Sequence, residues 1–93
     1  MNARKITLEE IRIQHFTKED VLTTFEDRFE RTHKLKTAMA LTNSDHDAVS
    51  LYVKLESGEV VEILSDLIDL GSDHVEIHGG FDIPLIAIVD VGV

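Results

Sequence analysis

The stretch VSLYVKLESGEVVEI, residues 49–63, decides the fold that this sequence predicts. Its first half alternates apolar residues with polar or amphipathic ones, which is the period of a strand with one buried face. Ser57-Gly58 then supplies a tight turn, and Val61 and Ile63 share one face of the strand that follows. We therefore predict a β-hairpin whose first strand buries Val49, Leu51, Val53 and Leu55.

The rest of the chain after this hairpin indicates more short strands. The alternation slips near Ser65-Asp66, which predicts a bulge or a strong bend. Residues 81–93 are rich in apolar side chains and contain Pro84, which lacks a ladder donor and marks a sheet edge or a break. Further turns are expected at Gly71-Ser72-Asp73 and Gly79-Gly80. Residues 48–93 should form a small, strongly bent antiparallel sheet or barrel of four to five strands.

A long amphipathic helix is expected before the sheet, over residues 17–42. Thr17 can cap it, with Glu19 and Asp20 placing negative charge in the first turn. Mostly apolar residues recur at steps of three and four and predict the buried stripe: Val21, Leu22, Phe25, Phe29, Thr32, Leu35 and Met39. The polar run 42–47 should end the helix.

The first sixteen residues fit two descriptions. Thr7 and Glu10 have the spacing of a capping box, which favours a short helix. Apolar residues also alternate there as in short strands, at Ile6 and Leu8 and again at Ile11 and Ile13. We expect an arm or a short helix over 1–16. The fold class is thus α+β, with an N-terminal amphipathic helix followed by the bent sheet, in a single domain over 1–93.

Composition excludes several classes of protein. There is no cysteine, so neither disulfides nor thiolate zinc sites can form. No apolar run approaches the roughly 20 residues of a transmembrane helix, and the charged start does not have the pattern of a secretory signal. A cytoplasmic location without membrane contact is the expectation.

Charge is divided unevenly along the chain, whose net charge is −9. Residues 1–42 hold eight Lys or Arg and seven Asp or Glu, whereas residues 43–93 hold Lys54 alone against eleven acidic residues. Such a surface repels phosphate backbones and attracts basic partners. We therefore expect no direct binding of nucleic acid.

Three segments carry a resemblance to a known fold: VSLYVKLESGEVVEI (49–63), IDLGSDHVEI (68–77) and IPLIAIVDV (83–91). Their turns and apolar positions resemble a small Sm-like or SH3-like barrel over residues 49–91. Rho-binding antiterminator and YolD-like proteins are similar in that a helix precedes the barrel. The resemblance implies a binding module without catalysis. The basic, histidine-containing stretch that the Hfq type uses on RNA is absent, so RNA binding is not implied.

Two polar clusters are candidate metal sites. His74, Glu76 and His78 would share one face of a strand and could bind zinc, but the outer two would lie roughly 13 Å apart along it. Asp45-His46-Asp47 could hold a metal or orient a base, although its composition is that of an ordinary turn. A solvated face and a turn are the favoured interpretations. No catalytic, cofactor or metal residue is predicted.

The acidic residues of the second half are the predicted partner-binding site. They crowd a short segment without a basic residue among them, and their mutual repulsion could be relieved by a partner with Lys or Arg. They are Glu56, Glu59, Glu62, Asp66, Asp69, Asp73, Glu76 and Asp82. The predicted function is a non-catalytic regulatory or adaptor module that docks on a basic protein.

Two alternatives stay open. The chain could be a structural homo-oligomer whose acidity serves solubility, joined through a strand edge in residues 81–93 or through Phe25 and Phe29. The third candidate is a small enzyme or a metal-binding protein.

Overall fold

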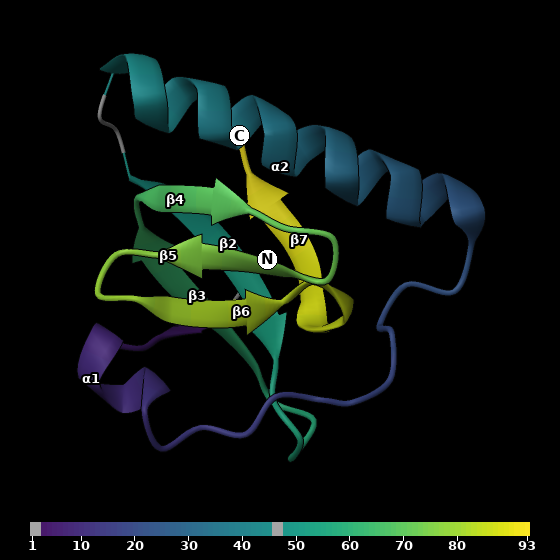
Figure 1. Cartoon of the computed structure of the whole chain (residues 1–93). Helices are drawn as coiled ribbons and strands as arrows, with labels where there is room; N and C mark the ends of the chain where they lie inside the picture. The colour runs from purple at the N-terminus through teal and green to yellow at the C-terminus, as the bar shows by residue number, and fades with distance from the viewer. Residues whose placement is uncertain (1–2, 46–47) are drawn as a thin grey trace.

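The computed structural model describes residues 3–45 and 48–93, which form one α+β unit (Figure 1). The helices are α1 (Leu8–Ile11), α2 (Phe25–Asp45) and the 3-10 turn η1 (Leu85–Ala87). The strands are β1 (Arg4–Lys5), β2 (Val49–Lys54), β3 (Val60–Ser65), β4 (Leu67–Leu70), β5 (His74–Ile77), β6 (Phe81–Pro84) and β7 (Ile88–Gly92). None of the described helices is both long and apolar enough to cross a membrane.

The strands form two sheets that lie one in front of the other (Figure 1). The first sheet has four strands in the order β1-β3-β2-β7, and the second has three in the order β4-β5-β6. Helix α2 runs along one side of both sheets and contacts β4 and β7. The strands do not close into a barrel. Residues 48–93 form six strands, β2 to β7, in two open sheets, and not the expected single sheet or barrel of four to five strands.

The hairpin of residues 49–65 is confirmed. Strands β2 and β3 pair antiparallel from Val49 opposite Ser65 to Lys54 opposite Val60, and Gly58 turns the chain with φ of 96°. All inward residues that the alternation predicted are buried: Val49, Leu51, Val53, Leu55, Val61 and Ile63. They form the centre of the core between the two sheets.

The break in alternation near Asp66 is where the chain changes sheets. Strand β3 ends at Ser65 and β4 begins at Leu67. The Ser65 hydroxyl donates to the carbonyl of Asp66 (3.0 Å) and accepts from the amide of His78 (3.2 Å). At the predicted bend the chain therefore crosses from the first sheet to the second, and the buried Ser65 stabilises this crossing.

Two later predictions, a glycine turn and a break at the proline, also hold. Gly79 and Gly80 both have positive φ, 90° and 81°, in the turn between β5 and β6, a conformation that glycine adopts without strain. Pro84 is the last residue of β6, which is an edge strand, and η1 follows it. The chain then returns to the first sheet as β7, which pairs with β2.

The helix prediction was wrong in its place and bounds. The long helix lies in the middle of the chain, after β1 and α1, and it runs from Phe25 to Asp45 instead of 17–42. Thr24 provides the capping hydroxyl, which accepts from the amide of Asp27 at 3.1 Å. Thr17 instead precedes an irregular segment, and the helix continues into the polar run 42–47 as far as Asp45.

The predicted buried stripe of the helix was also wrong for its first half. The buried helical residues are Arg31, Leu35, Ala38 and Thr42. Phe25 and Phe29 are 77% and 64% exposed. The buried face is thus rotated by about a quarter turn from the predicted one.

The arm before α2 contains the short helix that the sequence suggested. Thr7 and Glu10 form a complete capping box at the start of α1. The strand in the arm, β1, pairs in parallel with β3 but lies at Arg4–Lys5, before the residues whose alternation suggested strands. After α1, Phe16 forms an isolated bridge with Leu55, just after β2 and beside the β2–β3 turn.

Candidate functional site

Three carboxylates lie in one row across the second sheet. Asp69 on β4 is paired in register with Glu76 on β5, and Glu76 is paired with Asp82 on β6. Their strand neighbours Val75, Ile77 and Ile83 are buried, so the row faces outward. Residues directly opposite on adjacent strands have Cβ atoms roughly 5 Å apart, so these like charges repel one another.

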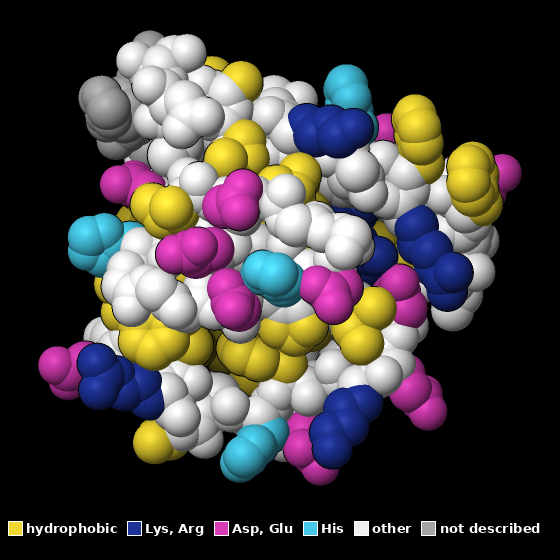
Figure 2. Space-filling view, viewed as in Figure 1, with side chains coloured by type: hydrophobic (Ala, Val, Ile, Leu, Met, Phe, Trp, Pro, Cys, Tyr) yellow, Lys and Arg dark blue, Asp and Glu magenta, His cyan; other side chains and the backbone are white. Residues whose placement is uncertain are grey.

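A histidine lies beside this row. The Nδ1 of His74 is 2.7 Å from Oδ1 of Asp73, and its Nε2 is 3.7 Å from Oδ1 of Asp82. The hydrogen bond to Asp73, with the charges of Asp82 and Asp69, raises the pKa of His74 above its ordinary value. We call Asp69, Asp73, Glu76 and Asp82, with His74 among them, the acidic face. Figure 2 shows acidic side chains gathered around a histidine over β4–β6.

The other four predicted partner-binding residues lie elsewhere. Glu59 is held by a two-pronged pair with Arg4 (3.0 and 3.1 Å), which lowers the pKa of Glu59. Glu62 accepts from the hydroxyl of Ser50 at 2.6 Å on the outer face of the first sheet. Glu56 lies in the β2–β3 turn and Asp66 at the crossover between the sheets. The structure thus brings together only half of the predicted set.

The metal candidates can now be placed. His74 is engaged by two aspartates, and His78 follows the end of β5, where its backbone amide donates to Ser65. Across residues 3–45 and 48–93, no three His, Asp or Glu side chains are arranged to hold a metal ion. Of the second candidate, Asp45 ends α2, and His46 and Asp47 lie outside the described residues.

A second charged cluster joins α2 to β7 and to the segment before the helix. Arg31 is 8% exposed and donates to both carboxylate oxygens of Asp20, at 2.8 and 2.9 Å, and to the carbonyl of Ile88. Nearby, Nζ of Lys34 is 2.8 Å from Oδ1 of Asp90 on β7. These two pairs are the ionic clamp.

The pKa values of the clamp follow from these contacts. The hydrogen bond from Arg31 lowers the pKa of Asp20. Burial acts to raise the pKa of Asp90, but Lys34 and the amide of Val91 outweigh it, so the net shift is downward. The pKa of Lys34 is raised by its bond to Asp90. All three groups are therefore held in their charged forms.

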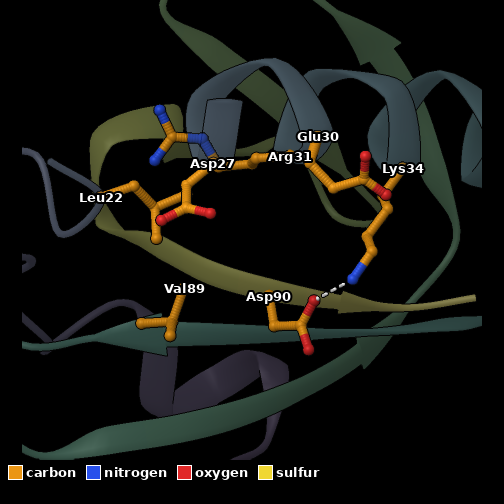
Figure 3. A pocket seen from close by; sticks show the side chains of 7 residues that line it. All are labelled: Leu22, Asp27, Glu30, Arg31, Lys34, Val89 and Asp90. Atoms are coloured by element: carbon orange, nitrogen blue, oxygen red, sulfur yellow. Dashed lines mark hydrogen bonds and ion pairs between the residues drawn. The ribbon is translucent and has the colours of Figure 1, made fainter. Parts of the chain in front are cut away.

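A cavity of about 110 Å³ lies beside the clamp (Figure 3). It is lined by Leu22, Asp27, Glu30, Arg31, Lys34, Val89 and Asp90, from the segment before α2, the helix and β7. Figure 3 shows Lys34 reaching across it to Asp90. The space suits a few water molecules. Because its cations are paired within the protein, the cavity is best explained as part of the clamp.

Two wider hollows flank the arm, with volumes of about 470 and 450 Å³. Both are lined in part by Gln14, His15 and Glu56. The amide of Glu56 donates to the carbonyl of His15 at 2.7 Å, which ties the arm to the β2–β3 turn. In the described part of the chain every buried side-chain nitrogen and oxygen has a hydrogen-bond partner, so none is left directed at a ligand.

Several of these contacts were missed by the sequence analysis. Asp20 and Arg31 are eleven residues apart, and Lys34 and Asp90 fifty-six, so no local spacing reveals them. The adjacency of Asp73 and His74 was visible, but the His74–Asp82 contact depends on the register of β5 and β6. A comparison with protein-family models, curated proteins and solved structures finds no match to this chain.

Proposed function

We propose that this chain is a non-catalytic regulatory or adaptor module whose acidic face docks on a basic protein partner. The observation that carries the proposal is the row Asp69–Glu76–Asp82, in which backbone register holds three carboxylates directly opposite one another. No Lys or Arg occurs in residues 67–93, so within this segment only histidine side chains can offset their charge. Repulsion of this kind costs stability, and a partner that supplies Lys or Arg would relieve it.

The exposure of the face supports an intermolecular role. The side chains of Asp73 and Asp82 are 87% and 62% exposed, so their carboxylates are open to a second protein. By contrast, Glu59 in the β2–β3 turn already has Arg4 as a partner within the chain. Charges at the rim of an interface mainly steer association and are screened by salt, so binding should weaken as ionic strength rises.

The test is capture of partners from a lysate of cells that express the protein, followed by a salt step and mass spectrometry. The bait is compared with a variant neutralised across the row, Asp69→Asn/Glu76→Gln/Asp82→Asn. A matched control, Glu9→Gln/Glu19→Gln/Glu56→Gln, changes net charge equally at exposed positions off the acidic face. We expect a basic protein that binds the wild type and the control and is lost from the row variant.

Three results would contradict the proposal. Equal loss from both variants would mean that net charge alone attracts the captured protein. Equal retention by both would place its binding site elsewhere on the chain. An absence of any enriched basic protein, with bait shown to be folded by circular dichroism, would count against the adaptor function as a whole.

A stability measurement on the protein alone tests whether the three carboxylates of the row repel one another. Because Glu76 is the middle carboxylate, Glu76→Gln should raise the free energy of unfolding by about 0.5 kcal/mol, within the range measured for cross-strand pairs. Urea denaturation at low salt measures this gain, which should shrink in high salt. A loss of stability would mean that the row is not a site of repulsion.

A further inference from the structure

Helix α2 carries a second stripe on the side away from its buried one. We call this the outer stripe; its members recur at steps of three and four residues, and all are exposed: Phe25, Phe29, His33, Lys36 and Ala40. The rings of Phe25 and Phe29 lie against each other with centroids 6.2 Å apart. Hydrophobic side chains stand out from the surface near the start of α2 (Figure 2).

Such a pair needs a physical explanation. Single exposed apolar residues are normal, but neighbouring large ones form a patch of the kind that marks an interaction site. A phenylalanine can bury roughly 150–250 Å² of surface, so two of them offer a substantial gain to any partner that covers them. Neither ring is needed to hold the helix on the sheets, because the buried stripe lies on the other side.

Charge along α2 indicates what covers the patch. Glu26, Asp27 and Glu30 lie in the first two turns, while residues 31–44 contain no acidic residue and include His33 and Lys36 on the outer stripe. Two copies of the helix packed antiparallel would place the acidic half of each against the basic half of the other. Their dipoles would also be opposed favourably. Parallel packing would set like charges together.

The charge on the rest of the surface also favours α2 as the contact between two copies. Residues 43–93 carry one basic and eleven acidic residues, so two copies repel each other through the faces of both sheets. Residues 31–44 of the helix hold three Lys or Arg and no acidic residue. Arg31 and Lys34 are paired with Asp20 and Asp90, so Lys36 is the cation that this half offers on the outer stripe. A second copy can therefore approach most easily along α2.

We propose that the chain forms a homodimer in which two α2 helices pack antiparallel through the outer stripe. In the register that centres the stripe, Phe25 lies opposite Ala40 of the second copy and Phe29 opposite Lys36. The small Ala40 leaves room for a phenyl ring, and the Lys36 ammonium can lie over the face of Phe29. Each contact occurs twice, as two-fold symmetry requires.

This interface is small. A helix of 21 residues is about 31 Å long, and one helix face of that length covers less area than a typical stable dimer interface. We therefore expect a dimer that dissociates on dilution.

Analytical ultracentrifugation of the full chain over a dilution series tests the proposal. The wild type should pass from the mass of two chains to that of one as it is diluted. Phe29→Glu should have the mass of one chain throughout, whereas Ile13→Glu, at a residue 74% exposed on the arm, should behave as the wild type. Circular dichroism checks that each variant is folded. A wild type of one-chain mass at every concentration, or a dimer that survives Phe29→Glu, would overturn the proposal.

Orientation has its own test, made simple because the chain has no cysteine. Glu26→Cys and Ala40→Cys are mixed and oxidised. Antiparallel packing predicts mixed 26–40 disulfides, and a preponderance of 26–26 and 40–40 disulfides would contradict it. Phe29→Glu leaves the acidic face unchanged, so it should still capture a basic partner; failure of dimerisation and failure of the adaptor function are thus observed separately.

Discussion

The two faces of α2 invert what hydropathy suggests. The buried stripe contains a charged residue, Arg31, while the outer stripe contains the stacked pair Phe25 and Phe29. Arg31 tolerates burial because a carboxylate and a backbone carbonyl meet its guanidinium at hydrogen-bond distance. The two rings have no such counterpart on the sheets. Whether a helical residue is buried therefore depends on the groups of the other elements that lie opposite it. The sequence of the helix alone does not contain that information.

Removing one apolar side chain from each face of α2 should change the stability of the protein by very different amounts. Leu35→Ala should lower the free energy of unfolding by about 3 kcal/mol, because Leu35 is completely buried and its loss leaves a cavity. Phe29→Ala should change it by less than about 0.5 kcal/mol, as expected for an exposed position. Urea denaturation at a concentration where the chain is monomeric measures both. Similar losses for the two would mean that the outer stripe packs within one chain.

The next largest effect is expected at the ionic clamp. Asp20→Ala leaves Arg31 buried without its carboxylate and should cost about 2–3 kcal/mol, somewhat below a fully buried pair because Asp20 is partly exposed. Glu19→Ala removes a neighbouring exposed carboxylate and serves as the control. Chemical denaturation compares the two. An effect of Asp20→Ala no larger than that of Glu19→Ala would show that the clamp does not hold the helix.

Acid should weaken the same clamp. Because the pKa of Asp20 is lowered in the folded protein, its contribution is complete above the unfolded value of about 3.9 and is lost as pH falls through the folded value. The stability difference between the wild type and Asp20→Asn should therefore be largest near neutral pH and shrink below about pH 4. Denaturation curves at several pH values measure it. A difference that grows on acidification would have the wrong sign.

A smaller effect separates two lysines of the helix. Lys34 pairs with Asp90 on β7, and Lys36 lies on the outer stripe. Lys34→Met should cost about 0.5 kcal/mol because the pair is partly exposed to solvent, and Lys36→Met should cost less in the monomer. If Lys36→Met lowers the free energy of unfolding more than Lys34→Met does in dilute solution, Lys36 makes a stabilising contact within its own chain, contrary to the prediction.

The strands could be predicted from the sequence because alternation reports burial directly. The inward residues of β2 and β3, the break at Asp66 and the glycine turns all followed from local pattern. The helix could be predicted only in outline. Phe25 and Phe29 determined which side of the helix was expected to be buried. The side that is buried contains Arg31, which is paired with Asp20 in the irregular segment before the helix.

The sequence shows that this part of the chain is acidic, but it does not show which carboxylates lie together on one face. Asp69 lies opposite Glu76 because a register shift falls between Leu67 and Asp69, and no sequence pattern located that shift. Glu59 lies apart from the acidic face and is paired with Arg4, which is 55 residues away in the chain. The pairing of distant segments selected four carboxylates from the eight expected.

The pairing of β7 with β2 joins two segments that are far apart in the chain, and this bears on the order of folding. The hairpin β2–β3 and the meander β4-β5-β6 join neighbouring segments and can close within microseconds, whereas Ser50 meets Gly92 across a long loop. Since α2 contacts β7, the helix should reach its final position only when that last strand arrives. Substitutions in the β2–β3 hairpin should therefore slow folding, and those in β7 should mainly hasten unfolding.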